Sequence, residues 1–179
     1  MKKQSLKALF ARLDARDAAI PLAELQAELG NTDLVSEDFQ RVVAFGDKTY
    51  RRNLLHEGPA YHALVICWRP GQRSPIHDHS GSSCAVQVLG GIATETAFAQ
   101  TGHGHVFATA STDHGVGSVL GSFDADAHQI SNLQPAGHDL VTLHIYSPPL
   151  LQMKRFSLTD AHVETFMDPI ELFLEGAGI

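Results

Sequence analysis

The chain has 179 residues, with 44% hydrophobic and 18% charged side chains and a formal net charge of −7 when histidine is neutral. This length and composition favour one globular domain over residues 1–179, and the negative charge argues against nucleic-acid and membrane partners. No run of 18 apolar residues predicts a transmembrane helix, and two cysteines, Cys67 and Cys84, are too few for a disulfide scaffold, so a cytoplasmic location is expected.

Residues 1–45 are expected to form a helical segment. In its first part, apolar side chains recur at helical spacing, at Leu6, Leu9, Phe10 and Leu13. A second helix should begin after Pro21 and end near Gly30, because apolar positions recur between them at Leu22, Leu25 and Leu29. Ser36-Glu37-Asp38 is expected to cap a third, short helix.

Residues 46–150 have a different sequence pattern from residues 1–45, with short apolar runs separated by Gly, Pro, Asp and Ser. This spacing predicts a mainly β fold, a small barrel or sandwich, with strands expected at residues 63–68, 84–89, 92–98, 116–120, 128–133 and 140–146. Residues 101–117 are rich in Gly, His, Ser and Thr and are expected to contain an exposed loop. In the C-terminal extension, residues 151–179, the spacing of Val163, Phe166 and Ile170 indicates a short helix.

His77 and His79 carry the strongest functional signal of the chain. Side chains at i and i+2 of an extended strand project from one face, so two imidazoles at this spacing can converge on one metal ion. His128 lies far downstream and is the candidate third ligand. His103-Gly-His105 repeats the pattern, but the glycines on both sides of His103 favour a flexible, exposed loop.

The surroundings of these histidines resemble the two sequence motifs of the cupin family. The matching residues are Gly71, His77, His79 and Gly91 for the first motif, and Gly121, His128 and Asn132 for the second. The resemblance implies a small, jelly-roll-like β-barrel with N-terminal α-helices and with the ligands in the barrel mouth. The alternative is a barrel that has lost its metal, in which the same residues are polar groups that only form hydrogen bonds within the protein.

Cys84 stands where many cupins carry an acidic ligand. A neutral set of three histidines leaves the +2 charge, and up to three positions of a six-coordinate metal, for external ligands. Imidazole suits both iron and zinc, so these residues alone do not choose the metal, and zinc would suit hydrolytic chemistry. Cys84 itself has three interpretations: a fourth ligand, a buried core thiol, or a reactive partner of a nearby side chain.

Over more than half of its length the chain resembles the cysteine dioxygenase family. The resemblance rests on Tyr50-Arg-Arg52-Asn53, His77-Asp-His79-x-x-x-x-Cys84 and Leu143-His144-Ile-Tyr146-Ser-Pro-Pro149. It implies an Fe(II) ion bound by His77, His79 and His128. It also implies that Arg52 pairs with the substrate carboxylate, for which a guanidinium fork is well suited, and that Tyr50 borders the same pocket.

The same resemblance gives catalytic roles to Tyr146, His144 and Cys84. The Tyr146 hydroxyl would lie beside the open iron positions, and in the family this tyrosine can be joined by a thioether to the cysteine at the place of Cys84. Thr142, where the family usually has serine, shares a strand face with His144 and Tyr146, so a hydrogen-bonded row is geometrically allowed. The Ser147-Pro148 bond is expected to be cis, as in the family.

The implied function is the O₂-dependent oxidation of L-cysteine to cysteine sulfinate, with cysteine and O₂ as partners. The nearest alternative is a 3-mercaptopropionate dioxygenase, which typically has glutamine where Arg52 stands, although a register slip of one residue would place Arg51 there instead. A zinc or manganese isomerase or hydrolase and a non-catalytic metal- or ligand-binding cupin are further alternatives. The sequence leaves the oligomeric state open, and a monomer is compatible with it.

Overall fold

The computed structural model describes residues 3–172. Its N-terminal part contains two α-helices and two short 3-10 turns: α1 (Leu6–Leu13), α2 (Leu22–Gly30), η1 (Ser36–Asp38) and η2 (Gln40–Val42). The Ser5 side chain caps α1 by accepting a hydrogen bond from the backbone N–H of Ala8 at 3.3 Å. No helix in the described part of the chain is long and apolar enough to cross a membrane.

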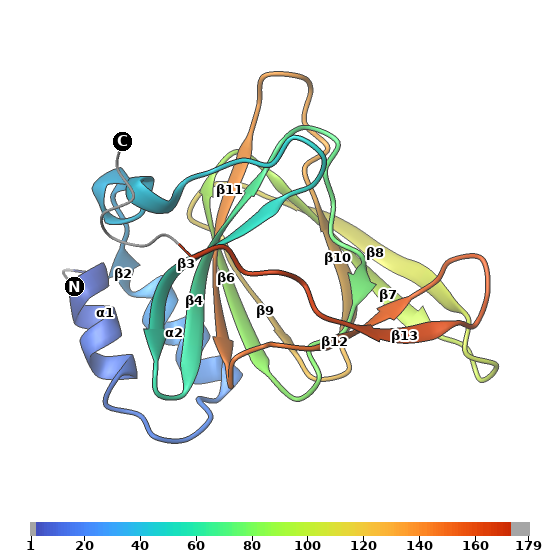
Figure 1. The fold of residues 1–179 in the computed structure, drawn as a ribbon, viewed down its shortest axis with the longest axis horizontal. Helices are drawn as coiled ribbons and strands as arrows, with labels where there is room; N and C mark the ends of the chain where they lie inside the picture. Colours follow the sequence, from blue (N-terminus) through green and yellow to red (C-terminus); the bar gives the residue numbers. More distant parts are fainter. Residues whose placement is uncertain (1–2, 173–179) are drawn as a thin grey trace.

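Two sheets face each other beside these helices (Figure 1). The five-stranded sheet has the order β3-β4-β11-β6-β9, formed in that order by Arg51–Gly58, Tyr61–Trp68, Leu140–Ser147, Ser83–Gly90 and Val119–Phe123. The six-stranded sheet has the order β13-β12-β5-β10-β7-β8, formed by Val163–Phe166, Met153–Phe156, Ile76–His77, Ala127–Ser131, Ala93–Gln100 and Val106–His114. A separate parallel pair joins β1 and β2, Gln4–Ser5 and Thr32–Asp33.

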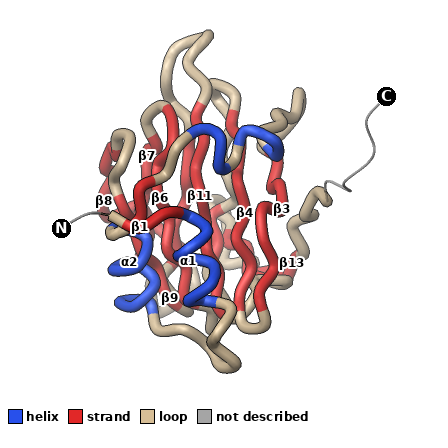
Figure 2. Tube along the Cα trace, turned by 90° about the vertical axis from the view of Figure 1, so that its left-hand side faces the viewer, coloured by secondary structure: helices blue, strands red, loops and turns tan. Residues whose placement is uncertain are grey.

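Strand β4 shows why the five-stranded sheet is buried on both faces. Its side chains alternate, so that Ala63 and Cys67 join the apolar core on the helix side while Leu64 and Trp68 join the core between the two sheets. Helices α1 and α2 cover the outer face of this sheet (Figure 2). A strand that is buried on both faces has a continuous apolar sequence, which is the pattern that predicted a strand here.

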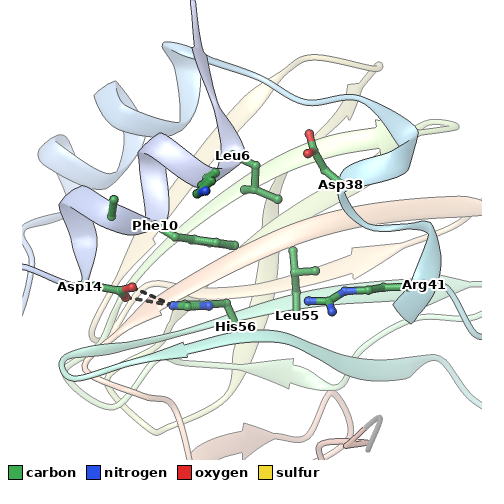
Figure 3. Close-up of a pocket in the computed structure, with 9 residues that line it drawn as sticks. Leu6, Phe10, Asp14, Asp38, Arg41, Leu55 and His56 are labelled. Atoms are coloured by element: carbon green, nitrogen blue, oxygen red, sulfur yellow. Dashed lines mark hydrogen bonds and ion pairs between the residues drawn. The ribbon is translucent and has the colours of Figure 1, made fainter. Parts of the chain in front are cut away.

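Helix α1 is attached to β3 by a small polar and aromatic cluster (Figure 3). The Phe10 ring stacks on the imidazole of His56 with centroids 4.3 Å apart, and His56 Nε2 lies 2.9 Å from Asp14 Oδ1. The Tyr61 hydroxyl donates to the same carboxylate oxygen at 2.8 Å. A surface hollow of about 440 Å³ lies between α1, the 3-10 turns and β3. These contacts fix the helices to the face of the sheet that is turned away from the histidines.

The structure corrects two of the predicted helices, the third helix of the N-terminal segment and the helix near the C-terminus. The predicted third helix consists only of η1 and η2, because Phe39 between them leaves helical geometry (φ −133°, ψ −11°). The predicted helix near the C-terminus is wrong, since residues 153–156 and 163–166 form the hairpin β12–β13, which pairs with β5. Backbone pairing with an existing sheet edge outweighs the helical spacing of Val163 and Phe166, which are not fully buried.

Among the described strands of eight residues or more, β3 and β8 lie where the sequence pattern predicted none. Residues 101–105 form the predicted exposed loop, but residues 106–114 form β8, an edge strand that pairs with β7 along its length and is largely exposed after Val106. Because both faces of β8 are exposed, its sequence shows no alternation of apolar and polar side chains. Strand β3 was not predicted either, because Arg52 and Asn53 on it are polar, yet both are buried. Polar strands of these two kinds escape a search for apolar runs.

Candidate functional site

Strands β5 and β10 bring the three candidate metal ligands together. His77 ends β5 and lies directly opposite His128 in the antiparallel pairing of β5 with β10, and His79 follows two residues later. One ring nitrogen from each of the three histidines lies within 4.8 Å of the other two, and all three side chains are buried. This arrangement can hold a metal ion.

The surroundings keep the imidazoles of His77 and His79 neutral. Burial, followed by the nearby His128, lowers the pKa of His77 to about 3, and the same two causes lower the pKa of His79 well below its usual value. His77 Nδ1 lies 3.0 Å from the Pro75 carbonyl, which leaves Nε2 for a ligand, while His79 Nδ1 is buried without a hydrogen-bond partner in the described residues. Neutral imidazoles are the form that binds metals, so the residues present fit a divalent metal ion.

Glu95 on β7 is a site residue that the sequence analysis missed. Its Oε1 lies 2.7 Å from His128 Nδ1, and its Oε2 lies 3.5 Å from His114 Nε2. Burial raises the pKa of Glu95, but the hydrogen bond to His128 and the electrostatic influence of His128 and His114 together lower it by more, so the net shift is downward and the carboxylate is ionised. A carboxylate in this position fixes the tautomer and orientation of a ligand histidine. Only the pairing of β7 with β10 brings Glu95 there.

The variant Glu95→Gln is expected to bind a divalent metal about 10- to 100-fold more weakly, because His128 loses the acceptor that orients its ring. The affinity would be measured on metal-free protein by competition with a chelator. The control is Glu57→Gln, which removes a carboxylate 3.5 Å from His62, a histidine outside the group of three that converge. Equal metal affinity in Glu95→Gln and the unchanged protein would contradict this role.

Strand β3 directs Arg52 into the space between the sheets. The side chain is 3% exposed, and its guanidinium carbon lies 5.6 Å from the centre of the Tyr146 ring. Nη1 donates to the Asp168 carbonyl at 2.6 Å, whereas Nη2 is buried without a hydrogen-bond partner in the described residues. Arg51, the preceding residue of the strand, instead pairs with Glu171 near the surface at 3.2 Å. A buried guanidinium with an unused N–H is a candidate binding site for a carboxylate.

Tyr50 and Asp168 close the pocket beside Arg52. The Tyr50 hydroxyl donates to the Asp168 carboxylate, and the Tyr50 ring stacks on Trp68 with centroids 4.4 Å apart. Burial, followed by the charge of Asp168, raises the pKa of Tyr50, so its hydroxyl stays protonated. Asp168 and Met153, which also lines the pocket, come from the C-terminal extension. No sequence signal pointed to either, because neither lies in a motif and only the path of the extension over the pocket brings them there.

Strand β11 places a row of polar side chains next to the histidines. Thr142 Oγ1 lies 2.9 Å from His144 Nε2, and His144 Nδ1 lies 3.0 Å from the Tyr146 hydroxyl. Trp68 Nε1, which can only donate, lies 3.0 Å from Thr142 Oγ1. The Thr142 hydroxyl has two possible acceptors for its proton, His144 Nε2 at 2.9 Å and the Ile66 carbonyl at 3.4 Å. In the His144 tautomer with its proton on Nδ1, Nε2 accepts from Thr142 and Nδ1 donates to Tyr146, whose own proton is left for a group in the pocket.

Cys84 on β6 lies directly opposite Tyr146 on β11. Its Sγ is buried and lies 4.0 Å from His144 Nδ1, and it is outside the group of three histidines whose nitrogens converge. Burial raises the pKa of the Cys84 thiol to about 12, and burial followed by this thiol raises the pKa of Tyr146 well above its usual value. Both groups are therefore protonated and neutral, and the geometry favours a partnership with Tyr146 over metal ligation.

Two smaller predictions concern features outside the histidine cluster. The Ser147-Pro148 bond is cis, as predicted. His103 and His105 are exposed and lie in the turn between β7 and β8, apart from the three converging histidines. A His-x-His pattern thus leads to convergence only where the backbone is held in place by neighbouring strands, as it is at His77.

The chain is similar in sequence to proteins of a known family. The sequence model of the family "cysteine dioxygenase type I" matches residues 5–159. The chain is 28% identical over 177 residues to cysteine dioxygenase type 1 of Danio rerio, which covers 92% of this chain and 85% of the relative. It is 26% identical over 150 residues to cysteine dioxygenase type 1 of Homo sapiens, covering 80% and 73% of the two chains.

Solved structures support the fold at lower identity. The TT1209 protein of Thermus thermophilus has a TM-score of 0.52 and 14% identity, covering 62% of this chain and 94% of that one. An uncharacterized protein with a double-stranded β-helix domain from Klebsiella pneumoniae has a TM-score of 0.51 and 17% identity, covering 61% and 80%. These likenesses concern the fold alone. They confirm the predicted mainly β architecture of the cupin, or double-stranded β-helix, type.

Proposed function

The chain belongs to the cysteine dioxygenase type I family, and we propose that it oxidises L-cysteine to cysteine sulfinate with O₂, using iron(II) as its cofactor. The observation that carries this proposal is one pocket lined both by two of the converging histidines, His77 and His128, and by a buried arginine with an unused N–H. A small molecule with a thiol at one end and a carboxylate at the other would complement both features.

His77, His79 and His128 would hold the iron through one ring nitrogen each. When bound, iron(II) would supply a Lewis-acidic and redox-active centre with positions open to a thiolate and to O₂. Because no carboxylate from residues 3–172 joins the three nitrogens, the charge of the metal would remain available to favour the thiolate form of the substrate. Cys84 stands at the place of an acidic ligand and, as a protonated thiol, contributes no negative charge.

Arg52 would bind the substrate carboxylate through Nη2, the nitrogen that has no partner in the described residues. The guanidinium is almost fully removed from water, which strengthens an interaction with an anion. Tyr50 would border the same end of the pocket. Holding the carboxylate there would place the thiol of the substrate toward the histidines, and orientation of this kind accounts for a large part of the rate in many enzymes.

Tyr146 would hold a proton at the edge of the pocket. A His144 protonated on Nδ1 would donate to the Tyr146 oxygen, and Thr142 Oγ1, which accepts from Trp68, lies 2.9 Å from the opposite ring nitrogen, Nε2. The phenolic O–H would then be free to donate to an oxygen atom on which negative charge develops. In this proposal Tyr146 is the catalytic group, and His144 positions it.

The proposed reaction needs no external reductant, because a thiol R–SH and O₂ together give the sulfinic acid R–SO₂H with both oxygen atoms on sulfur. Its partners are a small thiol amino acid and O₂, and the proposed location is the cytoplasm, where cysteine is kept reduced. The second candidate substrate is 3-mercaptopropionate, which has the same two end groups without the amine. Arg52 favours cysteine, since the resemblance associates glutamine at this position with 3-mercaptopropionate.

Oxygen uptake by the iron(II)-loaded protein tests the proposed function. L-cysteine is expected to be consumed together with an equal amount of O₂ and to appear as cysteine sulfinate, with a higher kcat/KM than 3-mercaptopropionate. The control is the same protein loaded with zinc, which cannot take part in redox chemistry. If neither thiol is consumed by the iron-loaded protein, the dioxygenase proposal is wrong and a non-catalytic cupin is favoured. A higher kcat/KM for 3-mercaptopropionate would reverse the substrate assignment alone.

We further propose that Cys84 and Tyr146 become joined by a thioether. The new bond would link Cys84 Sγ to the Tyr146 ring carbon beside the hydroxyl, and two hydrogen atoms with their electrons would pass to O₂, giving peroxide. Support comes from the directly opposed positions of the two residues on β6 and β11. Both are buried, so the link would form inside the pocket rather than with an external thiol.

After incubation with iron(II), cysteine and O₂, the intact mass is expected to fall by the mass of two hydrogen atoms. Cys84→Ser should abolish the loss, because it removes the sulfur that would form the bond. Cys67→Ser is the matched control, since Cys67 is the other free, buried cysteine but lies in the core on the helix side of the sheet. A loss that persists in Cys84→Ser would reject the link.

A further inference from the structure

The last described residues form a strap, residues 167–172, across the pocket. After β13 the chain leaves the six-stranded sheet and runs to β3 at the edge of the five-stranded sheet (Figure 1, dark red). There the N–H of Glu171 donates to the Arg52 carbonyl at 2.7 Å, and the Leu54 N–H donates to the Glu171 carbonyl at 2.9 Å. These two backbone hydrogen bonds attach the strap to β3.

Asp168 lies within the strap and contacts both proposed substrate-binding residues. Its backbone carbonyl accepts from Arg52 Nη1 at 2.6 Å, and its carboxylate accepts from the Tyr50 hydroxyl. The same carboxylate lies 3.9 Å from the Arg52 guanidinium. The negative charge of the strap is therefore placed beside the group that would bind the substrate carboxylate. Two carboxylates next to one buried guanidinium repel each other.

The strap is the wall between two spaces. The inner space, next to the histidines, measures only about 20 Å³, which is room for about one water molecule. The outer space is a groove of about 520 Å³ between the strap and residues 46–52. Tyr50, Arg52 and Asp168 line both spaces. The hollow beneath α1 shares no lining residue with the inner space, so it is not a second opening of the pocket (Figure 3).

The strap itself is lightly held. Met167 and Leu172 are 70% and 65% exposed, so its ends bury little apolar surface. The ion pair between Glu171 and Arg51 joins two partly exposed side chains and contributes little. Segments with few buried contacts open at low free-energy cost. On the pocket side the strap is held by the contacts of Asp168 and by Ile170, which is partly buried against the core between the sheets.

We propose that Asp168 is a latch that keeps substrate out of the pocket until the strap opens. Resting on the proposed function, the inference is that a thiol with a carboxylate reaches the histidines from the outer groove. Its carboxylate then replaces that of Asp168 beside Arg52. Opening would join the outer groove to the inner space, which by itself is too small for a molecule the size of cysteine.

The variant Asp168→Ala removes the carboxylate and is expected to populate the open strap. Backbone hydrogen exchange at the N–H groups of Leu54 and Glu171 should become at least about tenfold faster. Binding of L-cysteine to the iron(II)-loaded protein without oxygen should become at least about threefold tighter, because the apparent dissociation constant falls as the open fraction rises. Asp168→Asn retains an acceptor for Tyr50 and should give smaller changes in the same direction.

Glu171→Gln is the matched control, because it removes a carboxylate from the same strap but one that pairs with Arg51 on the outside. It should leave exchange and cysteine binding within about twofold of the unchanged protein. Unchanged exchange in Asp168→Ala overturns the inference, and so does weaker cysteine binding, which would mean that Asp168 only supports Arg52. If Asp168→Ala does not fold, the same readouts on Asp168→Asn decide.

Sulfinate formation in air separates this inference from the proposed function. If the unchanged protein forms sulfinate but the Asp168 variants bind cysteine no more tightly, the latch is wrong and the proposed function stands. If exchange and cysteine binding change as expected while no sulfinate is formed, the proposed function is wrong and the latch stands.

Discussion

Replacing His79 by alanine is expected to remove the bound iron and to abolish cysteine-dependent oxygen uptake. His79 is one of three histidines whose nitrogens converge, and its Nδ1 has no hydrogen-bond partner in the described residues, so the substitution breaks no other polar contact of the ring. Loss of a residue that only orients a ligand already weakens metal binding about 10- to 100-fold, so loss of a ligand should lower activity at least about 100-fold. Iron content per chain and the rate of oxygen uptake are the measurements.

The matched control for this substitution is His103→Ala. His103 belongs to the other His-x-His pattern of the chain, but it is exposed in the turn between β7 and β8. The control should retain both iron and activity. If His79→Ala keeps a full complement of iron, the three histidines are not the metal site; if His103→Ala loses iron as well, the loss in His79→Ala says nothing about this particular cluster.

Replacing Arg52 by alanine is expected to weaken cysteine binding by about 2 kcal/mol or more, which corresponds to a fall in kcat/KM of at least about 30-fold. The reason is that the substrate carboxylate would enter a nearly dry pocket without its charged partner, since Arg52 is 3% exposed. Steady-state kinetics on the iron(II)-loaded protein would show the loss mainly as a higher KM.

Arg51→Ala is the natural control, because the sequence alone leaves open which of the two adjacent arginines faces the pocket. In the structure, Arg51 pairs with Glu171 at a partly exposed position, so its removal should change KM by no more than about twofold. A larger fall of kcat/KM in Arg51→Ala than in Arg52→Ala would show that Arg51, and not Arg52, binds the substrate carboxylate. An unchanged KM and kcat in Arg52→Ala would reject the assignment of the carboxylate site.

The fold was predictable wherever burial leaves a periodic trace in the sequence. The helices α1 and α2 and the strand β4 have this trace, because their apolar faces pack into the cores. Strands β3 and β8 do not, because one carries buried polar residues and the other is exposed on both faces. The C-terminal hairpin was mistaken for a helix for a related reason, since two apolar residues three positions apart fit a helix as well as a loosely packed strand.

For the site, the chemical groups could be read from the sequence: two closely spaced histidines, a third downstream, and a cysteine, an arginine and a tyrosine in family motifs. These are local patterns, although β5 ends at His77 and His79 lies two residues beyond it. The partners of these groups depend on the tertiary structure. Glu95 reaches His128 through the pairing of β7 with β10, and Asp168 reaches Arg52 because the strap returns to β3. Contacts between residues far apart in the chain depend on strand register and on the path of the chain, which no local pattern records.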